Sequence, residues 1–149
     1  MFTPKRILVP TDFSAYSDKA LEQAIDLSKQ YKSTIYLIHV VDIIRQCSMD
    51  YCMDPRTLEI LEKDSMAMAE RMLKEQVDRI PESKSVDIKR DIRKGGPPSE
   101  EILRIQAANQ IDLIVIASHG KTGLLHHLIG SVAEKVTRGA KCPVLLVRA

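Results

Sequence analysis

Four short apolar runs constrain the fold of this chain more than any other feature of its sequence. They are rich in leucine and β-branched residues, they lack a regular alternation with polar positions, and they cover residues 7–9, 34–41, 113–116 and 144–147. Runs of this kind are typical of strands that are covered on both faces, as in a parallel sheet. A fifth segment, residues 86–92, does alternate, and it predicts an edge or half-buried strand.

Helical patterns separate these runs. Ser14 stands where it would cap the first helix, whose apolar positions recur at spacings of three and four. The other helices are predicted over residues 58–80, 97–107 and 131–139, and Gly139 is expected to end the last of them. Because strands and helices alternate through all 149 residues, we expect one α/β domain with a parallel sheet and helices on both faces.

The composition excludes several classes of function. The net charge is only +2 and no run of lysine and arginine stands out, so nucleic acid is not an expected partner. No apolar stretch approaches the roughly 20 residues of a membrane span, and we expect neither a secretory leader nor a membrane anchor. The three cysteines are an odd number without the spacing of a disulfide framework, which predicts a cytoplasmic protein.

The segment that follows the predicted strand at residues 113–116, residues 117–131, is the best candidate for a binding site in the sequence. It contains Gly120, Gly130 and several small residues, which let a backbone approach an anion closely. Ser131 then opens a helix, whose first N–H groups together carry about half a positive charge. This combination predicts a cradle for phosphate, and the alternative is a simple glycine-rich turn between a strand and a helix.

The same segment resembles the nucleotide-binding segment of the universal stress protein family. ATP-binding members of that family have a glycine, two residues, a second glycine, nine residues, and then Gly-Ser or Gly-Thr. Here Gly120, Gly130 and Ser131 match the second part of the motif, whereas Ala117 replaces its first glycine. The likeness extends over the whole chain in five ordered blocks, at residues 7–12, 37–40, 96–103, 117–131 and 141–147.

This resemblance implies a fold and a ligand. The fold would be a three-layer, Rossmann-like α/β fold of the adenine nucleotide alpha hydrolase type, with a five-stranded parallel sheet in the order 3-2-1-4-5. The ligand would be ATP, or AMP or ADP, bound at the carboxyl ends of the strands. The implied site residues are Pro10, Thr11 and Asp12 with Val40 around the adenosine, then Ala117, His119 and Gly120, and then Gly130, Ser131 and Val132 at the phosphates.

Magnesium is expected together with the nucleotide. ATP carries about four negative charges, whereas the segment supplies one certain cation, Lys121, and about half a charge from the helix start. The metal would be held mainly by phosphates and water, because few carboxylates lie nearby. Asp12 is the candidate carboxylate, and a contact with the ribose is its expected role.

The motifs of common catalysts are missing from the sequence. It has no Gly-x-Ser-x-Gly elbow, no Walker loop and no evident general base for a γ-phosphate, so we expect no catalytic residues. The leading hypothesis is a nucleotide-dependent sensor or switch in the stress response, with an unidentified protein partner. Two alternatives stay open: a nucleotide-free interaction module of the same fold, and a slow ATPase or phosphotransfer protein.

The remaining histidines and cysteines have simpler interpretations. His126 and His127 are predicted to be solvated, since adjacent histidines do not face one another as ligands at a spacing of four do. Cys47 and Cys52 are expected to be free thiols, with a zinc site or a disulfide as alternatives. Cys142 precedes an apolar strand and is expected to be buried and inert.

A homodimer is predicted from the last apolar run. In the implied order, residues 144–147 form an edge strand, and the chain ends two residues later, so we expect no later segment to cover it. A bare apolar edge invites strand addition, and pairing with a second copy about a twofold axis would satisfy it. A covered or twisted edge in a monomer is the alternative.

Overall fold

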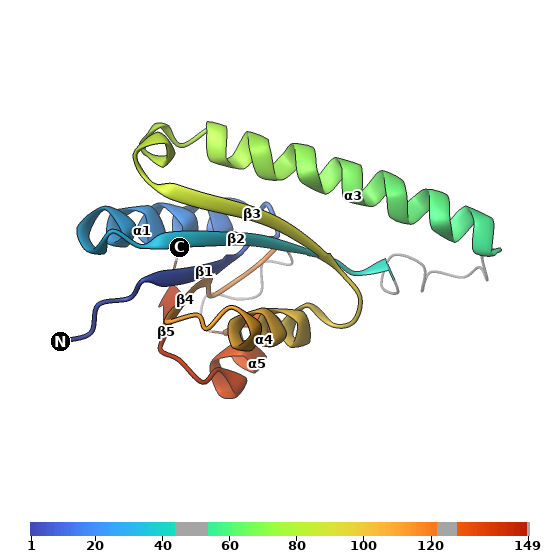
Figure 1. The fold of residues 1–149 in the computed structure, drawn as a ribbon. Coiled ribbons are helices and arrows are strands. Elements are labelled where there is room, and N and C mark those ends of the chain that lie inside the picture. The colour runs from blue at the N-terminus through green and yellow to red at the C-terminus, as the bar shows by residue number, and fades with distance from the viewer. Residues whose placement is uncertain (44–53, 122–127, 149) are drawn as a thin grey trace.

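A sheet of five parallel strands forms the centre of the molecule in the computed structural model, which describes residues 1–43, 54–121 and 128–148 (Figure 1). The strands lie in the order β3 (Asp87–Lys94), β2 (Thr34–Val41), β1 (Arg6–Pro10), β4 (Leu113–Ala117) and β5 (Val144–Val147). The predicted order is therefore confirmed. The order reverses between β1 and β4, and in open α/β sheets ligands bind outside the carboxyl ends of the strands at such a point.

Helices cover both faces of this sheet. α1 (Ala15–Tyr31) and α3 (Pro55–Asp78) lie on one face, and α4 (Pro98–Ala108) and α5 (Ser131–Gly139) lie on the other (Figure 1). A short 3-10 helix, Pro81–Ser85, links α3 to β3. The predicted helices and the three-layer arrangement are confirmed. None of the helices that the structure describes is long and apolar enough to cross a membrane.

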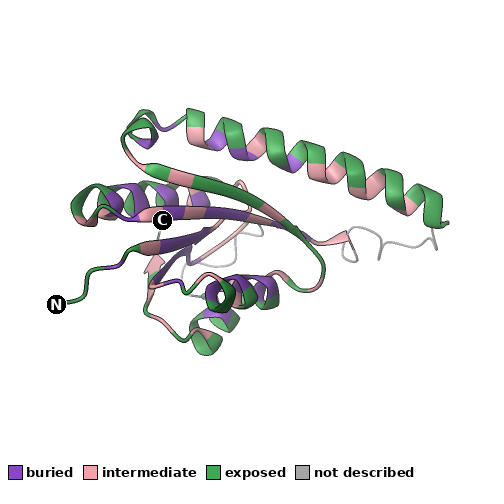
Figure 2. Ribbon diagram, in the orientation of Figure 1, coloured by how far each residue is buried: buried purple, intermediate pink, exposed green. Residues whose placement is uncertain are grey.

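Two apolar clusters, one on each face of the sheet, hold the layers together. In β1, Ile7 and Val9 pack toward α1 and α3, whereas Leu8 packs toward α4 and α5, and all three are fully buried. Burial on both faces explains why the central strands are unbroken apolar runs. Each such side chain contributes about 1.5–3 kcal/mol through its burial. Figure 2 shows the buried residues concentrated in the central strands and on the inner faces of the helices.

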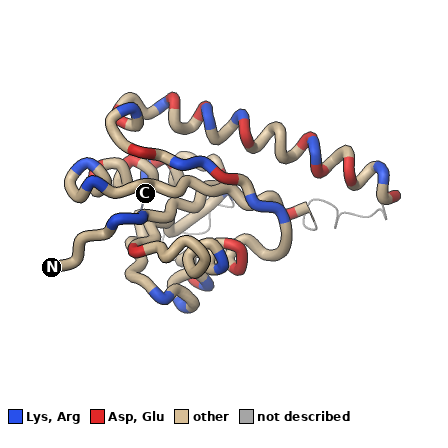
Figure 3. Tube along the Cα trace, in the orientation of Figure 1, with Lys and Arg blue, Asp and Glu red and all other residues tan. Residues whose placement is uncertain are grey.

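The edge formed by β3 is protected by charge. Arg93 pairs with Asp91 at 2.8 Å, and Lys94 pairs with Glu62 of α3. Figure 3 shows lysines and arginines along this strand with acidic residues between them. Charged side chains on an edge strand discourage the addition of a further strand. The alternating pattern that predicts an edge or half-buried strand is thus confirmed at this edge.

The other edge, β5, lacks such charges and corrects one expectation. The prediction that this run is covered on both faces is wrong, because Val144, Leu146 and Val147 are only half-buried and Leu145 is 38% exposed. The reason is its position in the sheet: within the described residues β5 pairs with β4 alone, so part of its surface faces outward.

Gly139 is the last residue of α5, as expected, but it does not end the helix in the usual way. Ala140 is the capping residue, and Gly139 does not adopt a left-handed conformation. A Cβ at position 139 would lie 2.6 Å from Leu103 Cδ1 of α4. Gly139 therefore allows α5 to pack closely against α4, which is a tertiary contact that no local pattern predicts.

Candidate functional site

The predicted site residues come together at the carboxyl edge of the sheet, although they belong to four separate segments. These segments are Pro10, Thr11 and Asp12 at the end of β1, Val40 near the end of β2, Ala117, His119 and Gly120 at the end of β4, and Gly130, Ser131 and Val132 at the start of α5. The Lys121 N–H donates to Asp12 Oδ2 at 2.8 Å, and the Gly130 N–H donates to Ser118 O at 2.8 Å. The topology assembles the site, while the role of each residue toward a ligand stays a prediction.

The Asp12 carboxylate is held by donors of the protein itself. Its Oδ1 accepts from the N–H and the hydroxyl of Ser14 at 3.0 and 2.5 Å, and its Oδ2 accepts from the Lys121 N–H. A Cβ on Gly120 would collide with Oδ2, so glycine is needed there for the carboxylate to reach Lys121. The Asp12 carboxylate therefore links the loop after β1 to the loop after β4. A ribose hydroxyl would have to bind this carboxylate in addition to the Ser14 and Lys121 donors.

Thr11 faces the interior rather than the solvent. The residue is 6% exposed, and its hydroxyl lies 2.9 Å from both Ser17 Oγ of α1 and Gln76 Oε1 of α3. Its backbone N–H donates to Ile38 O at 2.8 Å and extends the pairing of β1 with β2. A contact between Thr11 and a nucleotide would therefore come from its backbone.

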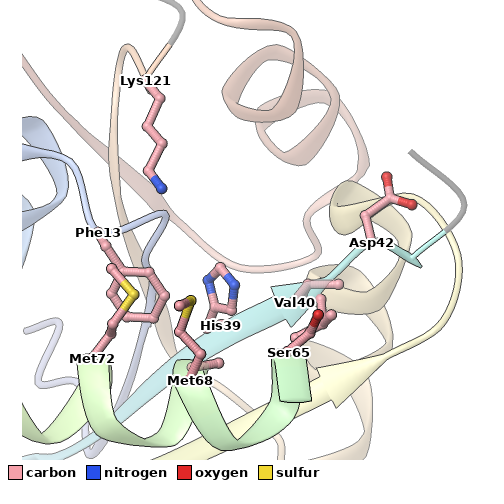
Figure 4. Close-up of a pocket in the computed structure, with 10 residues that line it drawn as sticks. Phe13, His39, Val40, Asp42, Ser65, Met68, Met72 and Lys121 are labelled. Carbon is pink, nitrogen blue, oxygen red and sulfur yellow. The ribbon is translucent and has the colours of Figure 1, made fainter. Parts of the chain in front are cut away.

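A cavity of about 320 Å³ opens beside these loops, between the end of β2 and one face of α3 (Figure 4). Its walls combine aromatic, aliphatic and sulfur-containing side chains with a few polar groups: Phe13, His39, Val40, Val41, Asp42, Ser65, Met68, Ala69, Met72 and Lys121. Figure 4 shows Met68 and Met72 rising from α3 and Lys121 reaching in from the loop after β4. A largely apolar cavity with a few polar groups is the usual form of a small-molecule site.

Phe13 and His39 form an aromatic wall of this cavity, with ring centroids 4.3 Å apart. Phe13 has a φ of 64°, a left-handed conformation that is unusual for a bulky residue. His39 Nδ1 lies 2.8 Å from the Thr11 carbonyl oxygen, which can only accept, so Nδ1 carries a proton and Nε2 is an acceptor. Burial is the main cause that lowers the pKa of His39 below its usual value, and the ring is therefore neutral at pH 7.

No side chain caps the start of α5. Gly130 is the N-cap residue and makes no side-chain cap hydrogen bond, and its own N–H is already bonded to Ser118 O. A Cβ on Gly130 would lie 3.3 Å from that same oxygen, so glycine suits this close approach. The amides of Ser131 and Val132 belong to the first turn, where N–H groups lack intrahelical acceptors. These two amides are the predicted phosphate donors, and Gly130 shapes the turn that presents them.

His119 and Ala117 lie on the strand side of this turn and differ in their surroundings. His119 Nδ1 is 2.8 Å from Ser118 Oγ, while its Nε2 is buried without a hydrogen-bond partner among residues 1–43, 54–121 and 128–148. A buried nitrogen without a partner is unfavourable, so this nitrogen is a candidate contact for a ligand. Ala117 is 8% exposed and belongs to the apolar cluster beneath α1 and α3. Its methyl therefore packs in the core, although the sequence pattern predicts it at the pocket wall.

Eight of the ten residues that line the cavity have no site role in the sequence analysis, among them Phe13, His39, Met68 and Met72. Spacing along the chain predicts Met68 and Met72 only as apolar positions of a helix, one turn apart, and ordinary core residues have the same spacing. Their place in a shared wall depends on how α3 docks beside β2. That information is not local in the sequence.

The other candidate residues lie away from this site or outside the described residues. His126, His127, Cys47 and Cys52 are outside the described residues, so their roles stay predictions. Cys142 is half-buried rather than buried, and burial raises the pKa of its thiol, which disfavours the reactive thiolate. In the part of the chain that the structure describes, no group of three or more histidine, cysteine, aspartate or glutamate residues could hold a metal ion.

The family of the chain follows from comparison with known proteins. The model of the universal stress protein family matches residues 3–148. The chain belongs to the universal stress protein family. A curated member, Universal stress protein MJ0531 of Methanocaldococcus jannaschii, is 33% identical over 151 residues, which cover 97% of this chain and 82% of that protein.

Solved structures share the fold of this universal stress protein. Protein MJ0577 of Methanocaldococcus jannaschii is 29% identical with a TM-score of 0.84, over 100% of this chain and 98% of that one. A universal stress protein family member from Arabidopsis thaliana, solved with AMP bound, is 20% identical with a TM-score of 0.64, over 97% of this chain and 92% of that one. At that lower identity, the Arabidopsis likeness concerns the fold alone.

Proposed function

We propose that this universal stress protein binds an adenine nucleotide, with the base in the cavity beside Val40 and the phosphates at the start of α5. The observation that carries the proposal is the uncapped start of α5, where Gly130 and Ser131 stand at the family spacing from Gly120. The family member from Arabidopsis thaliana, whose structure contains AMP, supports the same class of ligand.

The size and chemistry of the cavity suit a purine. Its volume of about 320 Å³ lies at the low end of the range for small-molecule sites, which is roughly 300–1,000 Å³. Phe13, Met68 and Met72 offer aromatic and thioether surfaces against which a flat base packs well. The backbone of Val40 would supply polar contacts to the base, and the neutral His39 ring would add an acceptor.

The phosphates would meet positive potential at the other end of the site. The first turn of α5 carries about half a positive charge, and Lys121 adds a full one. The acidic residue of that turn, Glu134, is paired with Arg138 at 2.9 Å. These charges do not balance ATP, which carries about four negative charges, so Mg²⁺ would accompany ATP and be held mainly by phosphate oxygens and water.

The proposed role is a nucleotide-dependent switch rather than a catalyst. Asp12 is the one carboxylate among the predicted site residues, and it already accepts three hydrogen bonds from the protein, which leave fewer lone pairs to take a proton from an attacking water. Occupancy would alter the loop after β4 and hence the surface offered to a protein partner in the stress response. The cytoplasmic location predicted from the cysteines is part of the same proposal.

Identification of the ligand would test this proposal directly. We expect the purified protein to release an adenine nucleotide on denaturation, detected by chromatography, and the emptied protein to bind AMP, ADP and ATP saturably in calorimetry. Mg²⁺ should strengthen the binding of ATP more than that of AMP. A folded protein that binds none of the three nucleotides would favour an interaction module without nucleotide. Steady phosphate release from ATP that disappears in Asp12→Asn would favour a slow ATPase.

A homodimer through β5 is the second part of the proposal. Within the described residues β5 pairs with β4 alone, so its other side leaves backbone N–H and C=O groups unpaired. Leu145 on the same strand is 38% exposed. A second copy, related by a twofold axis, would pair this edge and close the assembly.

Light scattering at micromolar concentration would test the dimer. We expect a dimeric parent and a monomeric Leu145→Lys variant, because the lysine places a charge in an apolar interface. Ile60→Lys is the matched control, since it places the same charge on an apolar residue of α3 that is 56% exposed, and it should remain dimeric. A monomeric parent, or a Leu145→Lys variant that stays dimeric, would contradict the proposal.

A further inference from the structure

Gln76 of α3 is completely buried, although an amide is unfavourable to bury without partners. Its Nε2 lies 2.7 Å from Asp18 Oδ1 and 3.5 Å from Ser17 Oγ, and its Oε1 lies 2.9 Å from the hydroxyl of Thr11. One side chain of α3 thus reaches both the first turn of α1 and the loop after β1. These contacts join three elements that are distant in the sequence and adjacent to the candidate site.

The direction of each hydrogen bond follows from the chemistry of the groups. The Asp18 carboxylate only accepts, so Nε2 of Gln76 must face Asp18, and Oε1 must face Thr11. An amide oxygen also only accepts, so the Thr11 hydroxyl donates its single proton to Gln76. The lone pairs of that hydroxyl then face other donors, and the Phe13 N–H lies 3.0 Å from it. Arg79 holds the Asp18 carboxylate from the solvent side at 3.1 and 3.2 Å.

This series of bonds ends at the cavity. Phe13 adopts a left-handed φ of 64°, which a bulky residue keeps only where its surroundings hold it. The Thr11 hydroxyl holds it through the backbone N–H, and the Phe13 ring lies against His39 at 4.3 Å. Met72, one helical turn before Gln76, lines the same cavity. α3 thus supplies Met72 to one wall of the cavity, and it also supplies Gln76, which holds Phe13 in another wall through Thr11.

We propose that Gln76 is a positioning residue for the nucleotide site: acting through Thr11, it holds Phe13 in the conformation that the bound base requires. This inference rests on the function proposed above and deepens it. Because the Asp18 carboxylate permits only one orientation of the amide, the Gln76 oxygen stays directed at Thr11, and a shift of Phe13 on binding is passed to α3 through Gln76. α3 is therefore the element that responds to occupancy of the cavity.

A pair of buried glutamines allows a matched test. Gln76→Met keeps the size of the side chain but removes its donor and its acceptor. Gln106 of α4 is the control: it is 7% exposed, it lies in the opposite helix layer, and its Oε1 accepts from the Lys141 N–H at 3.3 Å. Both methionine variants should lose stability. Only Gln76→Met should weaken AMP binding, by about tenfold in calorimetry, because one directed hydrogen bond to the loop is lost.

A double variant separates positioning from general packing. Gln76→Glu places a carboxylate against Asp18 and should weaken AMP binding at least as much as Gln76→Met does. The addition of Asp18→Asn should restore binding close to that of the parent. The new amide at position 18 then donates to the new carboxylate at position 76, whose other oxygen still accepts from the Thr11 hydroxyl.

Hydrogen exchange provides a readout that does not depend on the ligand. The Phe13 amide should exchange faster in Gln76→Met than in the parent or in Gln106→Met, because its acceptor Thr11 is no longer oriented. A parent that binds no AMP would contradict the proposed function, and the exchange of Phe13 would still report on the positioning role. The inference is overturned if Gln76→Met binds AMP as tightly as the parent, or if the folded double variant remains as weak as Gln76→Glu.

Discussion

The helices α1 and α5 both start at the carboxyl edge of the sheet, but their first turns are completed in different ways. α1 is capped by Ser14, whose hydroxyl accepts from the Ser17 N–H at 3.2 Å, and Asp18 adds a negative charge in the first turn. α5 begins at Gly130, which has no side chain to offer. A helix start that its own side chains complete stabilises the fold, whereas an incomplete one leaves amides for an anion. One junction thus serves stability, and the other is available for binding.

The largest effect is expected from blocking the start of α5. In Gly130→Val the Cβ would press on Ser118 O, at 3.3 Å, and the branched side chain would cover the first amides of the helix. We expect AMP binding to weaken by about a hundredfold or more in calorimetry, with circular dichroism unchanged. Gly96→Val is the matched control, because a Cβ there meets only Glu100 Oε2 at 3.8 Å. Undiminished binding in Gly130→Val would show that phosphates do not sit at this helix.

Ala117→Gly restores the glycine of the family motif. The variant tests whether the methyl of Ala117 packs in the core beneath α1 or against the ligand. The methyl packs in the cluster beneath α1, so its loss and the added flexibility of glycine should lower the free energy of unfolding by about 1.5 kcal/mol. AMP affinity should stay equal or rise slightly. Urea denaturation and calorimetry would measure the two quantities separately. Reduced affinity with unchanged stability would place the methyl against the ligand instead.

Removal of the α1 cap should lower the stability of the fold and leave AMP affinity nearly unchanged, whereas Gly130→Val should do the reverse. Ser14→Ala deletes the hydroxyl that caps the helix and should lower the free energy of unfolding by about 1 kcal/mol in urea denaturation. Its effect on AMP affinity should be much smaller than that of Gly130→Val. Ser85→Ala is the control, since this exposed hydroxyl bonds, within the described residues, only to the Glu82 carbonyl oxygen and caps no α-helix. An unchanged stability in Ser14→Ala would remove the contrast between the two junctions.

The smallest effect concerns pH and His39, which is bonded to the loop that leads into α1. Burial holds the pKa of His39 below its usual value of 6.5, so the unfolded chain takes up a proton before the folded protein does as the pH falls. The free energy of unfolding should therefore decrease as the pH falls through 6.5 toward the folded pKa. His39→Gln lacks this titration and should lose less stability between pH 7.5 and 5.5 in urea denaturation. An equal loss in parent and variant would assign the pH dependence to other groups.

Local chemistry explains which parts of the fold could be predicted from the sequence. Ser14 marks a helix start through its capping hydroxyl, and Pro98 does so because its missing N–H needs no partner in a first turn. The unbroken apolar runs mark the central strands because both faces of these strands are covered. The order of the strands is different: it follows from the family resemblance, since no local pattern says which strands are neighbours.

Residues whose roles depend on docking between elements could not be assigned from the sequence. Gln76 occurs in a helical pattern like any other polar residue, and its network exists only because α3 lies against α1 and the loop after β1. Phe13 adopts its left-handed conformation under the same constraint. Gly139 is a plausible helix terminator by pattern, but the approach of Leu103 gives it a packing role.

The two halves of α3 are buried to different extents among the described residues. Its buried residues, Ala69, Leu73 and Gln76, all lie in its second half, whereas Ile60 in the first half is 56% exposed. Figure 1 shows the first half of the helix extending past the ends of the strands. A less buried segment opens more readily than a buried one, so we expect the first half to unwind while the core stays intact and the second half to open only with the whole fold. We therefore expect two thermodynamic regimes within one continuous helix, with their boundary near Met68, at the wall of the cavity.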